Sequence, residues 1–170
     1  VQYLPIPVVA MIDGSVWGGA CDLALSCDLL LGSPNAKFTM TPAKIGVPYN
    51  ASGILHFMNT LGVNTAKEMF FTARPVEAQH ALEVGLLNHL VPNEVLESFT
   101  YDIAQQITRN SPLSIAAIKE QIRLLASASP LSPLMFERIQ GLRQQVFESR
   151  DYEEGIQAFL EKRTPDYLGE

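Results

Sequence analysis

The sequence predicts an α/β core over residues 1–110, followed by a region over residues 111–170 that is entirely helical. Two short apolar runs enclose a glycine turn and a helix of small residues, which is the order of a strand–helix–strand unit. From Ala51 onwards, apolar residues recur at the spacing of amphipathic helices. The second region carries helical spacing throughout, and we treat the two regions as separate units.

The first predicted element is a strand at residues 8–12, Val-Val-Ala-Met-Ile, which Asp13-Gly14 ends. A continuous apolar run bounded by a turn is typical of a strand buried on both faces. Three further elements complete the unit: a glycine turn into a short helix, a second buried strand and a weakly alternating strand. They are expected at residues 18–26, 29–31 and 37–41.

Residues 51–73 predict helix in two parts, because the apolar stripe stops at Gly62 and resumes at Ala66. Pro75 is expected in the first turn of a further helix that ends at Gly85, since proline is tolerated at a helix start and glycine at its end. A returning strand and a longer helix follow, at residues 86–91 and 94–109.

The second region opens with Ser111 as an N-cap and proline in the first turn. Its first helix carries Lys119 and Arg123 on a solvated face, opposite a broad apolar face of Ile115, Ile118, Ile122, Leu124 and Leu125. A face wider than one stripe needs cover on a second side. Residues 129–133 are read as a linker and residues 136–162 as helix, with a tail at 163–170.

Composition excludes several classes of function. The net charge of −6 disfavours duplex nucleic acid and anionic membrane as partners, and no apolar run reaches the ~18 residues of a membrane span. Only 18% of residues are charged, below the ~25% of a typical soluble domain, which points to a homo-oligomer. Cys21 and Cys27 form neither a CxxC pair nor a metal set. With no secretory signal visible, we expect reduced thiols, no bound metal and a cytoplasmic location.

The stretch from Gly14 to Asp22 is the most informative candidate for a ligand-binding or catalytic site. Consecutive glycines between a strand and a helix let backbone approach a ligand closely, and N–H groups at a helix start favour an anion or a developing oxyanion. The alternative is a tight turn that simply needs small residues. No nucleotide fingerprint and no G-x-S-x-G nucleophile motif fits the spacing.

Taken together, these residues resemble the crotonase (enoyl-CoA hydratase/isomerase) superfamily. The likeness rests on residues 5–28, 38–42, 46–50, 117–120 and 154–163. It implies a partial crotonase-like ββα superhelix followed by a helical oligomerisation region, assembled as a trimer or a pair of trimers. About the first third of the family pattern is absent, and that part would hold most adenine contacts of coenzyme A and one oxyanion donor.

The resemblance also implies roles for individual residues. The backbone N–H of Gly19 would be one oxyanion donor to the thioester carbonyl, and Tyr49 would hydrogen-bond a carboxylate of the substrate. Further substrate contacts are implied for Trp17, Gly18, Asp22, Thr41 and Pro42. Phe159 and Lys162 match tail positions that reach a neighbouring subunit's coenzyme A site. No cofactor is implied beyond the coenzyme A of the acyl-CoA substrate.

Several of these residues have simpler explanations. Asp22 in a first helical turn complements the helix dipole, and Tyr49 is able to anchor a proline turn. Thr41 need not contact the substrate, and Lys162 need only be a solvated lysine at a helix end. The three histidines, His56, His80 and His89, share no partner along the sequence and are read as structural or surface residues.

Two positions separate the possible activities. The two glutamates that activate water in related hydratases correspond here to Asp22 and Ala43, so one is shortened and the other has no acid–base capacity. Hydration requires both an acid and a base, whereas decarboxylation needs no base. Segments 17–20, 46–50 and 136–141 are most similar to superfamily members that decarboxylate a malonyl-type thioester such as methylmalonyl-CoA. The alternatives are a hydratase or isomerase using Asp22, and a catalytically silent coenzyme A-binding or assembly subunit.

Overall fold

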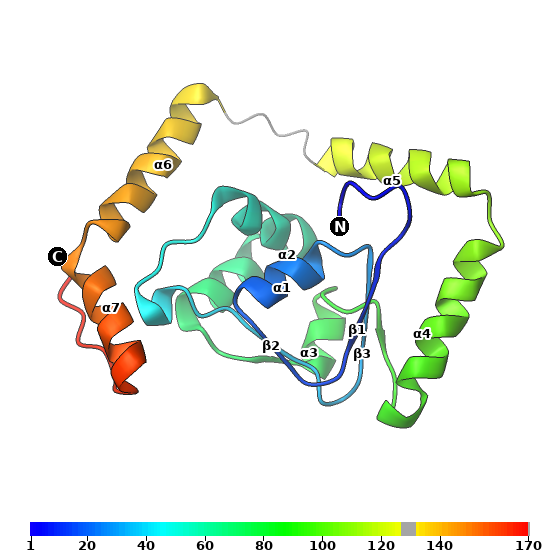
Figure 1. The fold of residues 1–170 in the computed structure, drawn as a ribbon, viewed down its shortest axis with the longest axis horizontal. Coiled ribbons are helices and arrows are strands. Elements are labelled where there is room, and N and C mark those ends of the chain that lie inside the picture. The colour runs from blue at the N-terminus through cyan, green and yellow to red at the C-terminus, as the bar shows by residue number, and fades with distance from the viewer. Residues whose placement is uncertain (127–131, 170) are drawn as a thin grey trace.

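The computed structural model describes residues 1–126 and 132–169. An α/β core lies in the middle of the molecule, and helices flank it on two opposite sides (Figure 1). The strands are β1 (Val9–Ile12), β2 (Ser15–Trp17), β3 (Leu29–Gly32), β4 (Lys37–Thr39), β5 (Val76–Glu77) and β6 (His89–Leu90). The core helices are α1 (Gly19–Leu25), the 3-10 turn η1 (Ala43–Ile45), α2 (Ala51–Thr72) and α3 (Ala78–Glu83). The flanking helices are α4 (Asn93–Thr108), α5 (Pro112–Ala126), α6 (Pro133–Phe147) and α7 (Arg150–Glu161).

The strands form two small sheets. In the first, β1, β3 and β6 run parallel in that order, with Val9 opposite Leu29. In the second, β4 lies between β2 and β5, parallel to β2 and antiparallel to β5. The parallel pairs β1–β3 and β2–β4 follow from the strand–helix–strand order, so the predicted α/β class is confirmed.

The core fills the space between the sheets and helices α1, α2 and α3. Its largest fully buried side chains are Phe38, Phe57, Leu31, Met40 and Met69. Helix α2 is capped by Asn50, whose side-chain oxygen accepts a bond from the Gly53 N–H. It is broken at Gly62, where φ is 75° and ψ is 164°, so the predicted interruption is confirmed.

Two local predictions are wrong. Pro75 is not in a helix: it precedes strand β5, and α3 begins at Ala78. The expected helix at 136–162 is two helices, because Glu148 ends α6 and Ser149 caps α7 with its side-chain oxygen. Both cysteines are free thiols.

The returning strand at 86–91 is shorter than expected. Only residues 89–90 form β6, while Leu86 and Leu87 are buried in the core. The predicted linker at 129–133 falls partly outside the described residues, and its last two residues, Ser132 and Pro133, cap and begin α6.

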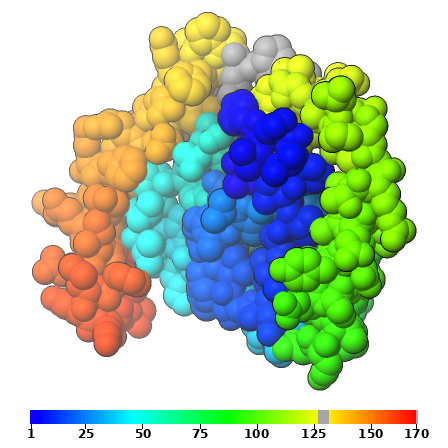
Figure 2. Space-filling model, turned by 45° about the vertical axis from the view of Figure 1, so that its right-hand side comes forward, coloured from blue at the N-terminus to red at the C-terminus, as the bar shows by residue number. Residues whose placement is uncertain are grey.

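Helix α5 turns its polar face towards its own chain, against expectation. Lys119 donates to the Ile6 carbonyl oxygen at 2.9 Å and pairs with Asp28 at 2.7 Å, and Arg123 stacks over the Tyr3 ring. The N-terminal segment lies against this helix (Figure 2). The prediction that these two cations are solvated is therefore wrong, because the sequence does not show which side of α5 the N-terminal carbonyls occupy.

Several apolar side chains of α5 point away from the core as a consequence, whereas Ile115 is half-buried. Ile118, Ile122 and Leu125 are exposed, and neither α5 nor α6 contains a buried residue. Among the described residues, no helix is both long and apolar enough to cross a membrane.

Candidate active site

Strand β2 turns sharply into helix α1 at two glycines. Gly18 is the N-cap, with φ of 51° and ψ of −118°, a conformation that glycine adopts without the penalty of a side chain. Its N–H donates to the Thr39 carbonyl oxygen at 2.8 Å, which ties the turn to β4. A Cβ added at Gly19 would meet nothing within 4 Å. The first N–H groups of a helix have no carbonyl partner within it, so the Gly19 N–H lies at an open edge of the turn.

Cys21 anchors the first turn of α1 in the core. Its thiol donates to the carbonyl oxygens of Val16, at 3.1 Å, and Thr39, at 3.6 Å. Burial raises the pKa of this thiol to about 11, so Cys21 stays protonated at neutral pH. It is a structural residue that holds the glycine turn in place, not a nucleophile.

The segment after η1 places Tyr49 in the wall of an apolar cavity. The cavity has a volume of about 370 Å³, and Tyr49 and Lys67 are the two residues with polar side chains in its wall. The apolar part of the wall comes from Pro42, Ala43, Val47, Ile54, Met58, Val63, Ala66, Phe70 and Phe71. The Tyr49 ring packs against Phe70 with 5.2 Å between centroids, which fixes where its hydroxyl points.

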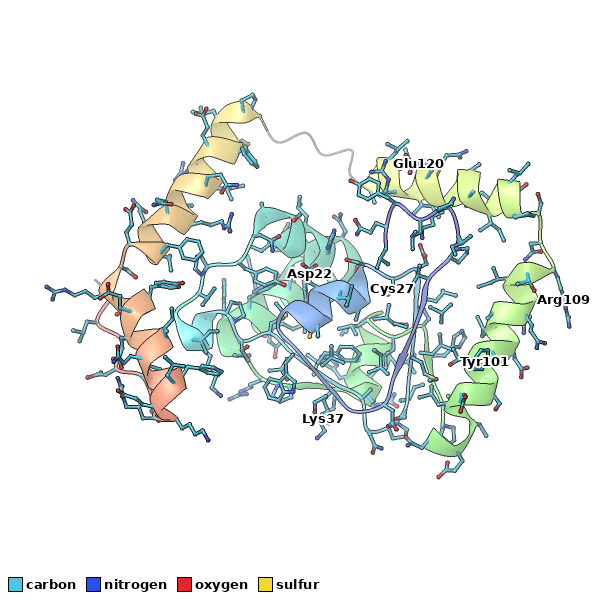
Figure 3. The ribbon with its side chains drawn as sticks, in the orientation of Figure 1. Asp22, Cys27, Lys37, Tyr101, Arg109 and Glu120 are labelled. Carbon is cyan, nitrogen blue, oxygen red and sulfur yellow. The ribbon has the colours of Figure 1, made fainter. Side chains whose placement is uncertain are left out.

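The Tyr49 ring lies beside the Asp22 carboxylate of α1, because a Cβ built at Gly53 would approach both the ring edge and Asp22 Oδ2. Burial, followed by the negative charge of Asp22, raises the pKa of Tyr49 to about 12. The phenol therefore remains a neutral hydrogen-bond donor throughout the neutral pH range. Figure 3 shows Asp22 on α1 close to the neighbouring helix α2.

A histidine of α2 completes this cluster from the other side. His56 Nδ1 lies 2.8 Å from Asp22 Oδ1, and both side chains are about three-quarters buried. The other ring nitrogen, Nε2, lies 2.9 Å from the Gln2 amide nitrogen. Hydrogen bonds thus link Asp22, His56 and Gln2, and Tyr49 lies beside the Asp22 end of this chain.

The close contact between α1 and α2 at this point requires Gly53. A Cβ at Gly53 would overlap the edge of the Tyr49 ring and approach Asp22 Oδ2 to 3.1 Å. Glycine is costly within a helix, and here its absent side chain is what lets the phenol and the carboxylate meet.

The other residues predicted for the site lie at varied distances from it. Pro42 is buried and lines the cavity, beside Ala43. Thr41 Oγ1 would lie 3.9 Å from a Cβ at Gly18, so this hydroxyl borders the glycine turn. Trp17, at the end of β2, is 54% exposed and does not line the cavity.

Phe159 and Lys162 are not brought to the cavity within this chain. Both are exposed, Phe159 on α7 and Lys162 at the residue that caps its end. Helix α7 packs on η1 with Gly155 facing the Ile45 carbonyl. Their expected role in a neighbour's site stays a prediction. Among the described residues, no three His, Cys, Asp or Glu side chains gather as metal ligands.

The whole chain, residues 1–170, matches the enoyl-CoA hydratase/isomerase family. The chain belongs to this family. Methylmalonyl-CoA decarboxylase of Escherichia coli (strain K12) is 47% identical over 169 residues, which cover 99% of this chain and 65% of that protein. Carnitinyl-CoA dehydratase of Citrobacter koseri is 34% identical, covering 96% of this chain and 63% of that protein.

A solved structure of methylmalonyl-CoA decarboxylase in complex with 2-nitronate-propionyl-CoA superposes with a TM-score of 0.97, at 47% identity, and covers 99% of this chain and 65% of that one. The predicted crotonase-like fold is therefore confirmed. The chain spans somewhat less than two thirds of the length of the curated relatives that it matches.

The sequence analysis did not anticipate one contact of a proposed site residue in this enoyl-CoA hydratase/isomerase family member. His56 was read as structural or surface, and the structure pairs it with Asp22. The only available signal was its place three residues after Gly53, which puts both on one side of α2. Its partner is 34 positions away in the sequence, so helical spacing alone does not reveal the pair.

Proposed function

We propose that this chain carries the site of an acyl-CoA decarboxylase that converts methylmalonyl-CoA, or a similar malonyl-type thioester, to propionyl-CoA and CO2. The observation that carries the proposal is an uncharged phenol donor, Tyr49, in an apolar wall that has Ala43 where a hydratase would need a second carboxylate. The similarity to a methylmalonyl-CoA decarboxylase at 47% identity supports the same reaction.

The proposed chemistry is stabilisation of a thioester enolate. The Gly19 N–H donates to the thioester oxygen, which gains negative charge as the bond to CO2 breaks. Donors of this kind act most strongly where charge develops, and loss of one in comparable sites costs ~100- to 1,000-fold in rate. The carboxylate itself supplies the electron pair, so no base is required in this step.

Tyr49 is proposed to orient the carboxylate that leaves. A phenol at neutral pH donates a hydrogen bond without adding a positive charge, and it therefore stabilises the bound carboxylate less than arginine would. The apolar wall around it favours the loss of charge from this group, because an isolated carboxylate is poorly accommodated in apolar surroundings. Both features favour departure of neutral CO2.

A second candidate is a hydratase or isomerase that uses Asp22. The Asp22–His56 pair favours it, since a carboxylate beside an imidazole is suited to proton transfer. The similarity to a carnitinyl-CoA dehydratase also favours it, at 34% identity. It is weaker because Asp22 is already paired with His56 and Ala43 offers no second acid or base.

We further propose a homo-oligomer, either a trimer or a pair of trimers, in which Phe159 and Lys162 reach a neighbouring subunit's coenzyme A. The exposed apolar faces of α5 and α6 support assembly. The mechanism uses no cofactor apart from the coenzyme A of the substrate. Two free thiols are in keeping with a cytoplasmic location.

The test is a direct comparison of two substrates with the full-length protein. Methylmalonyl-CoA is expected to lose CO2, measured as propionyl-CoA formed, while crotonyl-CoA is hydrated negligibly under the same conditions. Hydration that is faster than decarboxylation would instead identify a hydratase or isomerase that uses Asp22. Binding of coenzyme A esters without any turnover would identify a catalytically silent subunit.

A further inference from the structure

The segment that leads into Tyr49 separates two cavities. Ala43 and Val47 line the apolar cavity that contains Tyr49, and both also line a second cavity of about 660 Å³. Leu142 and Val146 of α6 contribute to the second cavity. Residues 43–48, the dividing segment, are therefore a thin wall with space on both sides.

The dividing segment has little packing of its own. None of residues 43–48 is fully buried, although Pro42, which precedes them, is. At the other end, the Tyr49 ring packs against Phe70. Within the segment, the Val47 N–H donates to the Pro42 carbonyl oxygen at 2.9 Å. A segment with few buried contacts takes its position from the elements that lie against it.

Helix α7 lies against the dividing segment, backbone to backbone (Figure 1). A Cβ added at Gly155 would overlap the Ile45 carbonyl group, and a Cβ at Gly46 would lie 2.7 Å from the Asp151 carbonyl oxygen. Asp151 and Gly155 are one turn apart and share one face of α7. The absence of side chains at both glycines is what allows this close approach.

The tail of the chain makes a second contact at the same place. The Tyr167 hydroxyl donates to the Lys44 carbonyl oxygen at 3.0 Å. The tail is folded back along α7, because the Asp151 carboxylate accepts from the Leu168 N–H at 2.8 Å. Two neighbouring carbonyl groups of the dividing segment, those of Lys44 and Ile45, are thus in contact with the C-terminal part of the chain.

We propose that Gly155 and Tyr167 are positioning residues for Tyr49. The inference rests on the proposed function, because it concerns the phenol that orients the leaving carboxylate. Helix α7 and Tyr167 hold the dividing segment from the outer side, and neither residue touches the substrate.

The path from this contact to Tyr49 is short and stiff. Only Val47 and Pro48 lie between Gly46 and Tyr49. Proline fixes its own φ and also restricts the residue before it, so a shift of Gly46 moves Tyr49 with it. A displacement of about 1 Å at a positioned group costs up to ~100-fold in rate.

The experiment compares two variants of the full-length protein, each with a matched control. Gly155→Ala adds a methyl group at the contact, and Gly141→Ala on α6 adds one where it meets nothing within 4 Å. Tyr167→Phe removes the hydrogen bond to the dividing segment, and Tyr101→Phe removes an exposed hydroxyl on α4. The kcat of decarboxylation is measured at saturating methylmalonyl-CoA, so that weaker binding of coenzyme A does not enter.

We expect kcat to fall by about 10-fold in Gly155→Ala, because the added methyl group displaces the dividing segment. In Tyr167→Phe we expect a fall of about 3-fold, within the range of one neutral hydrogen bond. The two controls should equal the wild type. In a Tyr49→Phe background, both substitutions should change kcat by less than about twofold, because no hydroxyl remains to be misplaced.

A second measurement needs no turnover. The amide groups of residues 44–47 all donate to backbone carbonyl oxygens between residues 41 and 43. We expect their hydrogen exchange to be faster in Gly155→Ala and in Tyr167→Phe than in the wild type. Exchange in the two controls should be unchanged.

The outcomes separate this proposal from the proposed function. If the wild type forms no propionyl-CoA, the proposed function is wrong, and hydrogen exchange alone decides whether α7 and the tail position the segment that leads into Tyr49. Unchanged exchange at residues 44–47 would overturn the proposal.

If the wild type is active and kcat falls by the same factor with and without the Tyr49 hydroxyl, Gly155 and Tyr167 only support the fold, and the proposal is wrong. An unchanged kcat in Tyr167→Phe and in a folded Gly155→Ala protein would also contradict it. If Gly155→Ala does not fold, Tyr167→Phe decides the matter by the same two measurements.

Discussion

The α/β core and the flanking helices α5 and α6 use the same kinds of apolar residue in opposite ways. Phe57 of α2 is fully buried by its own chain, whereas Leu125 of α5 is 75% exposed. Both lie on helices, and in the core the apolar residues of α2 pack into the buried cluster that includes residues of α1 and the sheets. On α5 the polar Lys119 makes the contacts with the chain, and the apolar face points outwards.

This difference separates what one subunit stabilises alone from what it leaves for another surface. Full burial of a leucine or isoleucine side chain is worth about 1.5–3 kcal/mol, and α5 and α6 forgo most of this energy in the isolated chain. The exposed apolar side chains on the two helices are Leu113, Ile118, Ile122, Leu124, Leu125, Leu134, Met135, Phe136, Leu142, Val146 and Phe147. The comparison predicts different responses to substitution in the two regions.

The largest expected effect is in the core. Phe57→Ala removes a fully buried ring that packs edge-on against Phe70, and should lower the free energy of unfolding by about 3–5 kcal/mol. Leu125→Ala should lower the urea midpoint only at subunit concentrations at which oligomers form, because its burial depends on a partner. Equal losses at every concentration would remove the distinction between the two regions.

The next effect concerns the site inside the core. Tyr49→Phe should lower the decarboxylation rate by about 10- to 100-fold, because one hydrogen bond to a charged group is worth ~1.5–3 kcal/mol. Asp22→Asn should cost less, since it leaves the phenol in place to orient the carboxylate. Tyr101→Phe on α4, where the ring is exposed, is the control and should not change the rate. A greater loss from Asp22→Asn would favour the hydratase or isomerase reading.

Charged residues introduced on the exposed apolar face of α5 are expected to change the fold of the single subunit little but to prevent its assembly. The double variant Ile122→Glu, Leu125→Glu should keep the circular dichroism of the wild type and sediment as a monomer. The reason is that its exposed apolar face no longer attracts a partner. Sedimentation of the wild type as a monomer at micromolar concentration would contradict assembly altogether.

Deletion from Gly155 onwards tests the proposed role of the tail in two ways. We expect weaker assembly and weaker coenzyme A binding together, measured by sedimentation and by titration calorimetry. Binding that stays unchanged while assembly is lost would separate Phe159 and Lys162 from the coenzyme A site.

The smallest effect is the pH response of the tail. Hydrogen bonds from Arg163, and then from the Asp166 N–H, lower the pKa of Glu154 to about 2. Because this folded-state value lies below the ordinary 4.5 of the side chain, the contribution is present above pH 4.5 and is lost as the pH falls towards 2. Arg163→Gln should release the tail at higher pH, seen as faster hydrogen exchange of its amides. Arg109→Gln, at the residue that caps the end of α4, is the control.

The sequence by itself determined the local features of the fold. The apolar run of β1, the glycine turn into α1 and the interruption at Gly62 were all predictable, because each depends on the residues of one short segment. The family resemblance extended this to Tyr49 and Asp22 as candidate site residues. Pro75 shows the limit: its neighbourhood suited a helix start, but pairing of the next residue, Val76, with Phe38 made a strand instead.

Only the tertiary structure decided which distant side chains meet. His56 joined the site because α1 and α2 approach closely at Gly53, and Lys119 turned inwards because carbonyl oxygens of the N-terminal segment were there to accept from it. Local spacing states which residues share a face, but not what that face contacts. An amphipathic helix turns towards the rest of the protein whichever face makes the more stabilising contacts there. For α5, the accepting carbonyl oxygen belongs to a residue more than a hundred positions away in the sequence.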